Sequence, residues 1–187
     1  LRFPQSFLAE SGLQELCQGF PLYIIHFFPS QAPVRRWCKM PERTLVIFTT
    51  DNGTARGQRL FNAGMRGNKG SSYDGGHRVP FFLHWPAGGF DRERRIDTLT
   101  AHIDVLPTLI ELCGLEKPKG VKMDGTSLRP LLEKGDHPDW PDRIIMTDSQ
   151  KKELPTKWAT TAVMSERWRL IEGKELYDID ADPGQKN

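Results

Sequence analysis

The stretch Thr44–Gly53, TLVIFTTDNG, decides the fold class of this 187-residue chain. Its first seven residues, Thr44–Thr50, form an unbroken run of mostly apolar and β-branched side chains. Such a run, apolar on both faces, predicts a buried strand of a parallel sheet that is covered by helices on each side. Asp51, Asn52 and Gly53 end the run, at the carboxyl end of the strand, where α/β sheets bind their ligands. We therefore expect an α/β fold.

The remaining elements follow from periodicity and from turn residues. Residues 54–78 are rich in glycine and predict a long loop, which in a compact domain is often functional. Further elements are expected as a strand at 79–85, a helix at 102–113, a helical turn at 127–132, and three antiparallel strands at 160–164, 168–171 and 175–177.

The chain is expected to have three parts. Residues 1–43 form an unassigned lead-in without sustained periodicity, in which only a short helix at 8–16 is expected. Residues 44–145 form the α/β part, and residues 146–187 form a small antiparallel subdomain.

Composition excludes several classes of protein. The 26 basic and 24 acidic residues nearly balance, which is unlike the basic footprint of a nucleic-acid binder. No apolar run is long enough to span a membrane, and no signal peptide is visible at Leu1. The three cysteines, Cys17, Cys38 and Cys113, form no CxxC pair, which argues against a zinc site and against a disulfide framework.

Asp51 and Asn52 are candidate ligands of a divalent cation. A carboxylate and an amide supply the hard oxygen donors that Ca²⁺ or Mg²⁺ takes. The alternative is a plain Asp-Asn-Gly turn, although the residues after Thr54 show no returning strand of a hairpin.

Lys69 is a candidate anion-binding residue. It lies in the glycine-rich segment Gly67–Ser72, where a lysine can meet an anion as a mobile point charge, and the segment is not a Walker A loop. The alternative is a solvated lysine. Arg78 could likewise bind an anion, but we expect it to pair with Asp74. Asp104, at the start of the predicted helix, is expected to interact favourably with the helix dipole.

Taken in order, six segments resemble the C-terminal half of sulfatases of the arylsulfatase type. The segments are TLVIFTTDNG (44–53), NKGSSYDGGHRVP (68–80), WPAG (85–88), AHIDVLPTLIELCGL (101–115), DGTSLRPLL (124–132) and ELYDIDADPGQKN (175–187). The resemblance covers about three quarters of the chain, from residue 43 onwards.

The resemblance implies a partial alkaline-phosphatase-like α/β sheet with helices on both faces and a small C-terminal antiparallel subdomain. It implies a divalent cation, usually Ca²⁺ (Mg²⁺ as the alternative), held partly by Asp51 and Asn52. It implies that Lys69 binds the sulfate and acts in catalysis. The expected substrate is a small sulfate ester or a sulfated glycan, and the family suggests a periplasmic or secreted location.

The chain departs from the family at the nucleophile. The family's nucleophile is a formylglycine made from cysteine in a Cys-x-Pro/Ala-Ser-Arg signature, and none of the three cysteines fits that pattern. The early paired aspartates of the family's metal site are also absent. We therefore expect a sulfuric ester hydrolase fragment that alone is inactive. The alternatives are a phosphodiesterase or phosphonate hydrolase of the same superfamily, or a non-catalytic calcium-binding relic.

Overall fold

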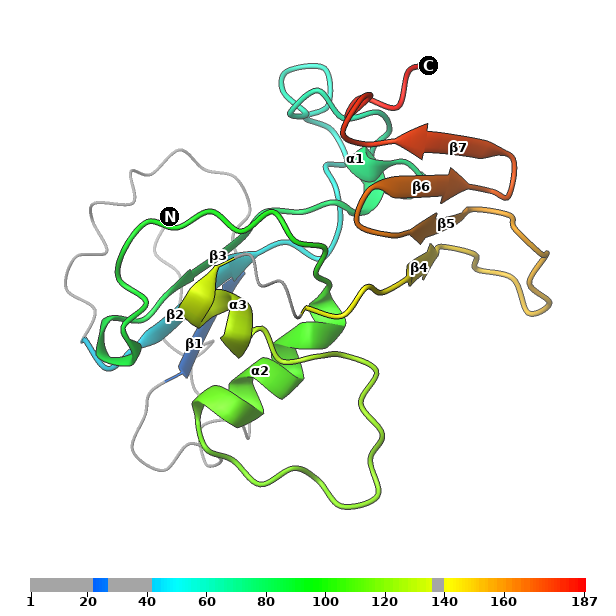
Figure 1. The fold of residues 1–187 in the computed structure, drawn as a ribbon. Helices are drawn as coiled ribbons and strands as arrows, with labels where there is room; N and C mark the ends of the chain where they lie inside the picture. Colours follow the sequence, from blue (N-terminus) through cyan, green and yellow to red (C-terminus); the bar gives the residue numbers. More distant parts are fainter. Residues whose placement is uncertain (1–21, 27–41, 136–139) are drawn as a thin grey trace, which may run out of the picture. The chain divides into compact units, whose positions relative to one another are not determined.

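The computed structural model describes residues 22–26, 42–135 and 140–187 (Figure 1). These residues form two compact units, each built from separate stretches of the chain. The first unit contains residues 22–26, 42–48, 82–95 and 102–135, and the second contains residues 49–81, 96–101 and 140–187. The division expected after residues 43 and 145 stays a prediction.

A three-stranded sheet, in the order β1-β2-β3, belongs mainly to the first unit. The predicted strand after Thr44 is confirmed as β2 (Leu45–Thr49), in which Leu45 and Ile47 are buried. The strand predicted at 79–85 is confirmed in shorter form as β3 (Phe81–His84).

Strand β1 (Leu22–His26) corrects the description of residues 1–43 as lacking strand structure. Pro21 and Pro29 flank this five-residue strand closely, so the sequence pattern around it is too short to show a period. Its neighbour in the sheet is β2, a partner that only the tertiary structure provides. The helix expected at 8–16 lies outside the described residues.

The helical elements of the first unit are close to those expected. A 3₁₀ turn, η3 (Pro86–Gly88), follows β3, and η4 (His102–Asp104) leads directly into α2 (Val105–Leu112). The predicted turn at 127–132 is found as α3 (Arg129–Lys134), which contacts α2. No helix of the described residues is long and apolar enough to cross a membrane.

Asp104 links the start of α2 to the segment before α3, a role beyond the expected interaction with the helix dipole. Its side chain is fully buried, and Oδ1 accepts the backbone N–H of Thr126 at 2.9 Å. One turn later, the Thr108 hydroxyl accepts the backbone N–H of Leu128 at 2.8 Å. These two bonds fix both chain segments against each other inside the first unit.

The second unit is built on a four-stranded antiparallel sheet. Its order is β4 (Ile145–Asp148), β5 (Thr161–Met164), β6 (Trp168–Ile171) and β7 (Glu175–Asp178). Strands β5 to β7 confirm the predicted antiparallel subdomain. Strand β4 is an additional edge strand that the sequence did not predict, and it pairs with β5 in the register Ile145 to Met164.

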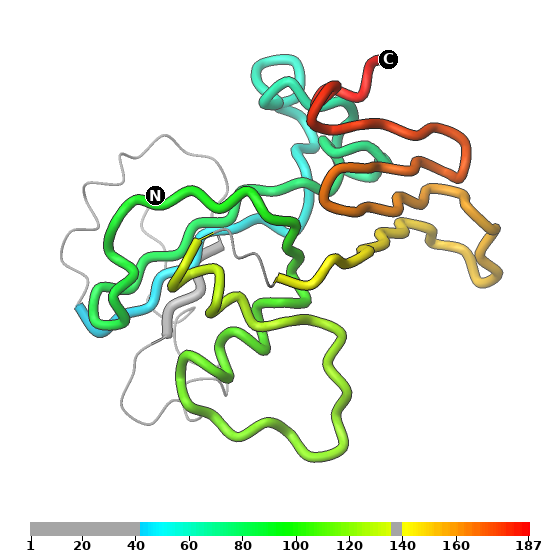
Figure 2. Tube along the Cα trace, in the orientation of Figure 1, coloured from blue at the N-terminus to red at the C-terminus, as the bar shows by residue number. Residues whose placement is uncertain are grey.

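The glycine-rich loop of residues 54–78 contains the short helix α1 (Asp74–His77), which was not predicted. Four residues, two of them glycines, are too few to show a helical period. The trace of this loop runs beside the C-terminal residues of the chain (Figure 2). Tyr73, the residue before α1, packs on the sheet core formed by Ala162, Ile171 and Tyr177.

Asp74, at the start of α1, is the centre of a buried polar cluster between the loop and the sheet. The Arg169 guanidinium lies 3.2 Å from its carboxylate, and these two side chains are only 8% and 1% exposed. His77 and Arg78 approach the same carboxylate at 3.5 and 3.6 Å, which confirms the expected pairing of Arg78 with Asp74. Gln185 Oε1 accepts the backbone N–H of Asp74 at 2.8 Å.

The charge of Asp74 is maintained by its neighbours. Burial by itself would raise the pKa of this carboxyl, but His77, Arg169 and Arg78 outweigh burial and hold its pKa below the ordinary value of 3.8. The carboxylate form is therefore the one that the folded unit stabilises.

Replacing Arg169 with Met is expected to lower the free energy of unfolding by about 3–5 kcal/mol, because it leaves the Asp74 carboxylate buried beside weaker partners. Urea titration followed by circular dichroism measures this change. The control is Arg167→Met, two positions before Arg169, which removes the exposed ion pair between Arg167 and Asp178. This change should have a far smaller effect on the free energy of unfolding. Equal losses in the two variants would show that Asp74–Arg169 is not central to the unit.

The stabilisation from Asp74 is expected to depend on pH. Because its pKa is lower in the folded state than in the unfolded state, its contribution is complete above the unfolded value near 3.8 and is lost as pH falls through the folded value. The difference in unfolding free energy between the wild type and Asp74→Asn should therefore shrink when pH is lowered from 7 to 3. A difference that is constant over this range would contradict the assignment.

Candidate functional site

Asp51 and Asn52 lie in the turn that directly follows β2, as the sequence predicts. The Asp51 side chain is exposed and Asn52 is half-buried, and the Thr50 hydroxyl donates to the backbone carbonyl of Asn52 at 3.1 Å. The backbone N–H of Gly53 then donates to the carbonyl of Gly76 at 3.0 Å. This contact ties the turn after β2 to helix α1 within the second unit.

Gly53 permits this contact because it has no side chain. A Cβ atom at this position would lie 1.8 Å from the carbonyl oxygen of Gly75, a distance that no side chain can adopt. Gly76 is equally restricted, since a Cβ there would lie 2.1 Å from the carbonyl oxygen of Ser71. The glycines that the sequence marks as loop residues thus allow two backbone segments to touch.

Lys69 lies in a tight turn against the same segment. Its backbone N–H donates to the carbonyl of Thr54 at 3.0 Å, two residues beyond Asn52. The turn closes through the backbone N–H of Asn68, which donates to the Ser71 hydroxyl at 3.1 Å, and Gly70 supplies a positive φ of 87°. The Lys69 side chain is exposed. The backbone segments that carry all three predicted site residues are therefore adjacent.

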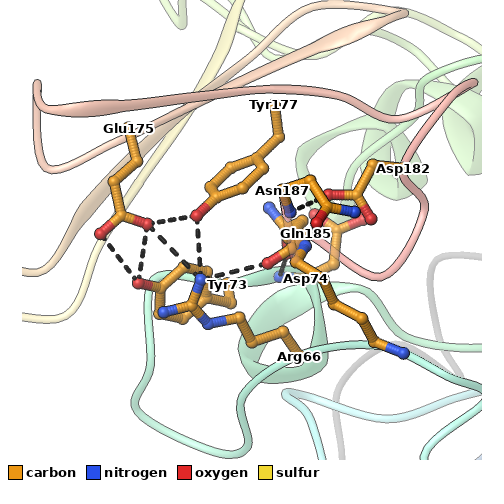
Figure 3. Close-up of polar contacts among 9 residues, drawn as sticks. Arg66, Tyr73, Asp74, Glu175, Tyr177, Asp182, Gln185 and Asn187 are labelled. Atoms are coloured by element: carbon orange, nitrogen blue, oxygen red, sulfur yellow. Dashed lines mark hydrogen bonds and ion pairs between the residues drawn. The ribbon is translucent and has the colours of Figure 1, made fainter.

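A second, more exposed cluster holds the loop that carries Lys69 against β7 (Figure 3). The Arg66 guanidinium stacks 3.8 Å from the centre of the Tyr73 ring. It also donates to the Tyr177 hydroxyl at 2.9 Å and to the Gln185 carbonyl at 3.1 Å. Glu175 lies 3.6 Å from Arg66 and accepts the Tyr73 hydroxyl at 3.0 Å. Loop and sheet thus form one hydrogen-bonded structure.

The protonation states in this cluster support one another. Hydrogen bonds from Tyr177 and Tyr73 lower the pKa of Glu175. The hydrogen bond to Glu175 raises the pKa of Tyr177. Burial, followed by the hydrogen bond to Glu175, raises the pKa of Tyr73. At neutral pH Glu175 is therefore an acceptor and both tyrosines are donors.

The β4–β5 connection contacts the Lys69 turn through Ser149. Ser149, the first residue after β4, donates its hydroxyl to the carbonyl of Gly70 at 3.4 Å. Since Gly70 is adjacent to Lys69, this contact places the start of the β4–β5 connection beside the candidate anion-binding turn.

The donors of Asp51 and Asn52 fit a hard divalent cation in chemical type, because both supply oxygen. They are too few to hold one alone. Among the described residues, no group of three His, Cys, Asp or Glu side chains is placed to bind a metal ion. A Ca²⁺ or Mg²⁺ ion at this turn would therefore need further ligands.

Sequence reasoning missed the residues that connect the loop to the sheet. Arg66, Glu175 and Gln185 contact partners about a hundred positions away, and no local pattern shows such a contact. Arg169 did give a signal. It alternates with exposed Trp168 on β6 and shares the buried face with Ile171, so a charged residue stands where the strand period requires an inward side chain.

Comparison with known proteins gives the family of this chain. The sequence profile described as "N-sulphoglucosamine sulphohydrolase, C-terminal" matches residues 67–187. Human arylsulfatase A is 35% identical over 172 residues, covering 77% of this chain and 33% of the human protein. The uncharacterized sulfatase YidJ of Escherichia coli K12 is 30% identical, covering 77% of this chain and 27% of its own length.

Solved structures agree with the sequence matches. The crystal structure of Ps i-CgsB superposes with a TM-score of 0.66 at 26% identity, covering 78% of this chain and 32% of that one. The phosphonate monoester hydrolase of Agrobacterium radiobacter gives a TM-score of 0.54 at 26% identity, covering 78% and 31%. The predicted alkaline-phosphatase-like fold class is thereby confirmed. This chain spans about a third of the length of these relatives, and it belongs to the sulfatase family, whose C-terminal portion it matches.

Proposed function

We propose that this chain is the part of a sulfuric ester hydrolase that binds the sulfate group of the substrate. Membership of the sulfatase family supports the reaction class. The single observation that supports the site is the Lys69 turn, whose backbone N–H at Lys69 donates to the carbonyl of Thr54, two residues after Asn52.

In this proposal Lys69 meets the sulfate group as a point charge. A sulfate ester is anionic, and further negative charge develops on the departing oxygen when the S–O bond breaks. An ammonium group that is already in place stabilises this charge without a reorganisation of the site. The two hydrogen-bonded clusters around Asp74 and Arg66 hold the loop in which Lys69 stands.

Asp51 and Asn52 would contribute two oxygen ligands to a divalent cation, Ca²⁺ in the first place. When bound, such a cation polarises the sulfate oxygens. The chemical type of the two donors and their position after β2 support this role. The formylglycine of the family would come from sequence other than these 187 residues, because no formylglycine signature occurs in them.

The proposed substrates are sulfate esters of small molecules or of glycans. Support for a glycan comes from one structural neighbour, Ps i-CgsB, which was solved in complex with k-i-k-neocarrahexaose and shares 26% identity with this chain.

A second candidate function is hydrolysis of phosphonate monoesters, which the similarity to the Agrobacterium radiobacter enzyme favours. Arylsulfatase A, mouse steryl-sulfatase and YidJ, at 35%, 38% and 30% identity, are sulfatases, so sulfate ester hydrolysis is better supported. A non-catalytic calcium-binding relic is the third candidate, and the missing nucleophile favours it. Turnover of an aryl sulfate, an aryl phosphonate, or neither, by a longer chain in which a formylglycine signature precedes this segment, separates the three.

Lys69→Ala is expected to weaken binding of 4-nitrocatechol sulfate to this chain by about tenfold, because removal of the ammonium charge leaves the bound sulfate without its counter-charge. Isothermal titration calorimetry with 5 mM Ca²⁺ present measures the change. Lys117→Ala, at an exposed position of the first unit, is the matched control. Unchanged affinity in Lys69→Ala would exclude Lys69 from the sulfate site.

Asp51→Ala is expected to lower kcat/KM for an aryl sulfate by about 10²–10³, as when one group that stabilises the transition state is removed. The assay requires a longer chain in which a formylglycine signature precedes this segment. Added Ca²⁺ should restore part of the activity if Asp51 is a ligand. Turnover equal to that of the unmodified enzyme would contradict the metal assignment.

A further inference from the structure

We propose that the β4–β5 connection binds a second anionic group of the substrate, so that this chain prefers saccharides with more than one sulfate. The inference deepens the proposed function and rests on Lys69 binding the sulfate that is cleaved. It is carried by a recess that opens beside the Lys69 turn and by two lysines on its wall.

The recess has a volume of about 310 Å³ and is lined by Ser149, Gln150, Lys151, Lys152, Ala159 and Thr160. This volume is at the lower end of the range of small-molecule sites, about 300–1,000 Å³. Ser149 connects the recess to the anion-binding turn, because its hydroxyl donates to the Gly70 carbonyl. Along the chain, Lys151 is then within about 20 Å of Lys69. A substrate of a few sugar units is long enough to contact both.

The wall of the recess is held in place by Gln150. Its side-chain amide donates to the Thr156 carbonyl at 3.0 Å and accepts the Thr156 backbone N–H at 2.7 Å, which closes the connection into a loop. The Asp148 carboxylate accepts both the backbone N–H and the side-chain amide of Gln150, at 2.8 and 2.9 Å. Lys151 and Lys152 therefore project from a preformed loop rather than from a free segment.

The two lysines are available for a ligand. Both are exposed, and within the described residues neither forms an ion pair. The Asp148 carboxylate, three positions before Lys151, is occupied: hydrogen bonds from Gln150 lower its pKa. Lys157 faces the Trp158 ring at 5.7 Å, so its charge is directed elsewhere. The loop contains one acidic residue, Glu153, next to the two basic residues Lys151 and Lys152.

A further observation concerns Thr160, which also lines the recess. Thr160 adopts a positive φ of 51°, an unfavourable backbone conformation for such a residue that is found at ligand clamps. The Thr160 hydroxyl is buried without a hydrogen-bond partner among the described residues. Because its oxygen is fully buried, this hydroxyl is not itself a contact for a ligand in the recess. The two ammonium groups of Lys151 and Lys152 fit a sulfate better than a neutral sugar.

The test compares two probes on the 187-residue chain by isothermal titration calorimetry at low ionic strength. One probe is galactose 4-sulfate, with a single sulfate, and the other is a κ-carrageenan tetrasaccharide, with two. The variant is Lys151→Gln with Lys152→Gln, and the control is Lys117→Gln with Lys119→Gln, two exposed lysines of the first unit. Circular dichroism verifies that each variant is folded.

We expect the wild type to bind the tetrasaccharide more tightly than galactose 4-sulfate. The Lys151/Lys152 variant should lose about tenfold in affinity for the tetrasaccharide, with no change for galactose 4-sulfate and none in the control. The proposal is overturned if the variant binds the tetrasaccharide like the wild type, if it loses affinity equally for both probes, or if the wild type binds neither.

Lys69→Ala separates this inference from the proposed function. If Lys69→Ala binds galactose 4-sulfate like the wild type while the Lys151/Lys152 variant loses the tetrasaccharide, the proposed role of Lys69 fails and the recess stands as an anion site. If Lys69→Ala loses galactose 4-sulfate and the Lys151/Lys152 variant loses nothing, the recess fails and the proposed function stands.

Discussion

The buried ion pair between Asp74 and Arg169 is the contact on which the second unit depends. Asp74 belongs to the glycine-rich loop and Arg169 to the antiparallel sheet, 95 positions later in the chain. A carboxylate this deeply buried is costly unless it is paired and hydrogen-bonded. Arg169, His77 and Arg78 are the charged partners of the carboxylate, and Gln185 accepts the backbone N–H of Asp74, so contacts from the sheet and from the C-terminal residues hold the loop.

The placement of Lys69 is a consequence of that anchoring. A loop of 25 residues with six glycines has a large conformational entropy, and its own short-range turns do not fix it. It is held at three places: by Asp74 on the sheet, by Arg66 on Tyr177 and Glu175, and by backbone bonds to the turn after β2. A point charge stabilises a transition state only where it is already in place, which gives these contacts a part in the proposed reaction.

We propose that the β4–β5 connection, which is also a loop held by hydrogen bonds, contributes to the choice of substrate. Gln150 holds this loop through both atoms of its amide, and Ser149 joins it to the turn of Lys69. In the proposed function, the elements that bind the reacting group and the rest of the substrate are thus attached to one antiparallel sheet. Variation in a short loop on such a scaffold can change the preferred substrate without disturbing the sheet beneath.

The sequence by itself determined the elements with a clear period or composition. The run of β-branched residues before Asp51 predicted β2, the helical spacing after His102 predicted α2, and the alternating runs near the C-terminus predicted β5 to β7. Ordered motifs also predicted the family, which the comparisons confirm. Each of these signals lies within a short window, where local side-chain patterning sets the structure.

Only the tertiary structure decided which distant residues these segments contact. Strands β1 and β4 are short segments that are identified as strands by their pairing with neighbouring strands. Helix α1 has only four residues, two of them glycines. The contacts of Asp74 with Arg169, Arg66 with Glu175, and Ser149 with Gly70 join residues far apart in sequence. Such pairings are set by the packing of loop against sheet and leave no trace in local periodicity, so no reading of the chain alone could place the recess beside Lys69.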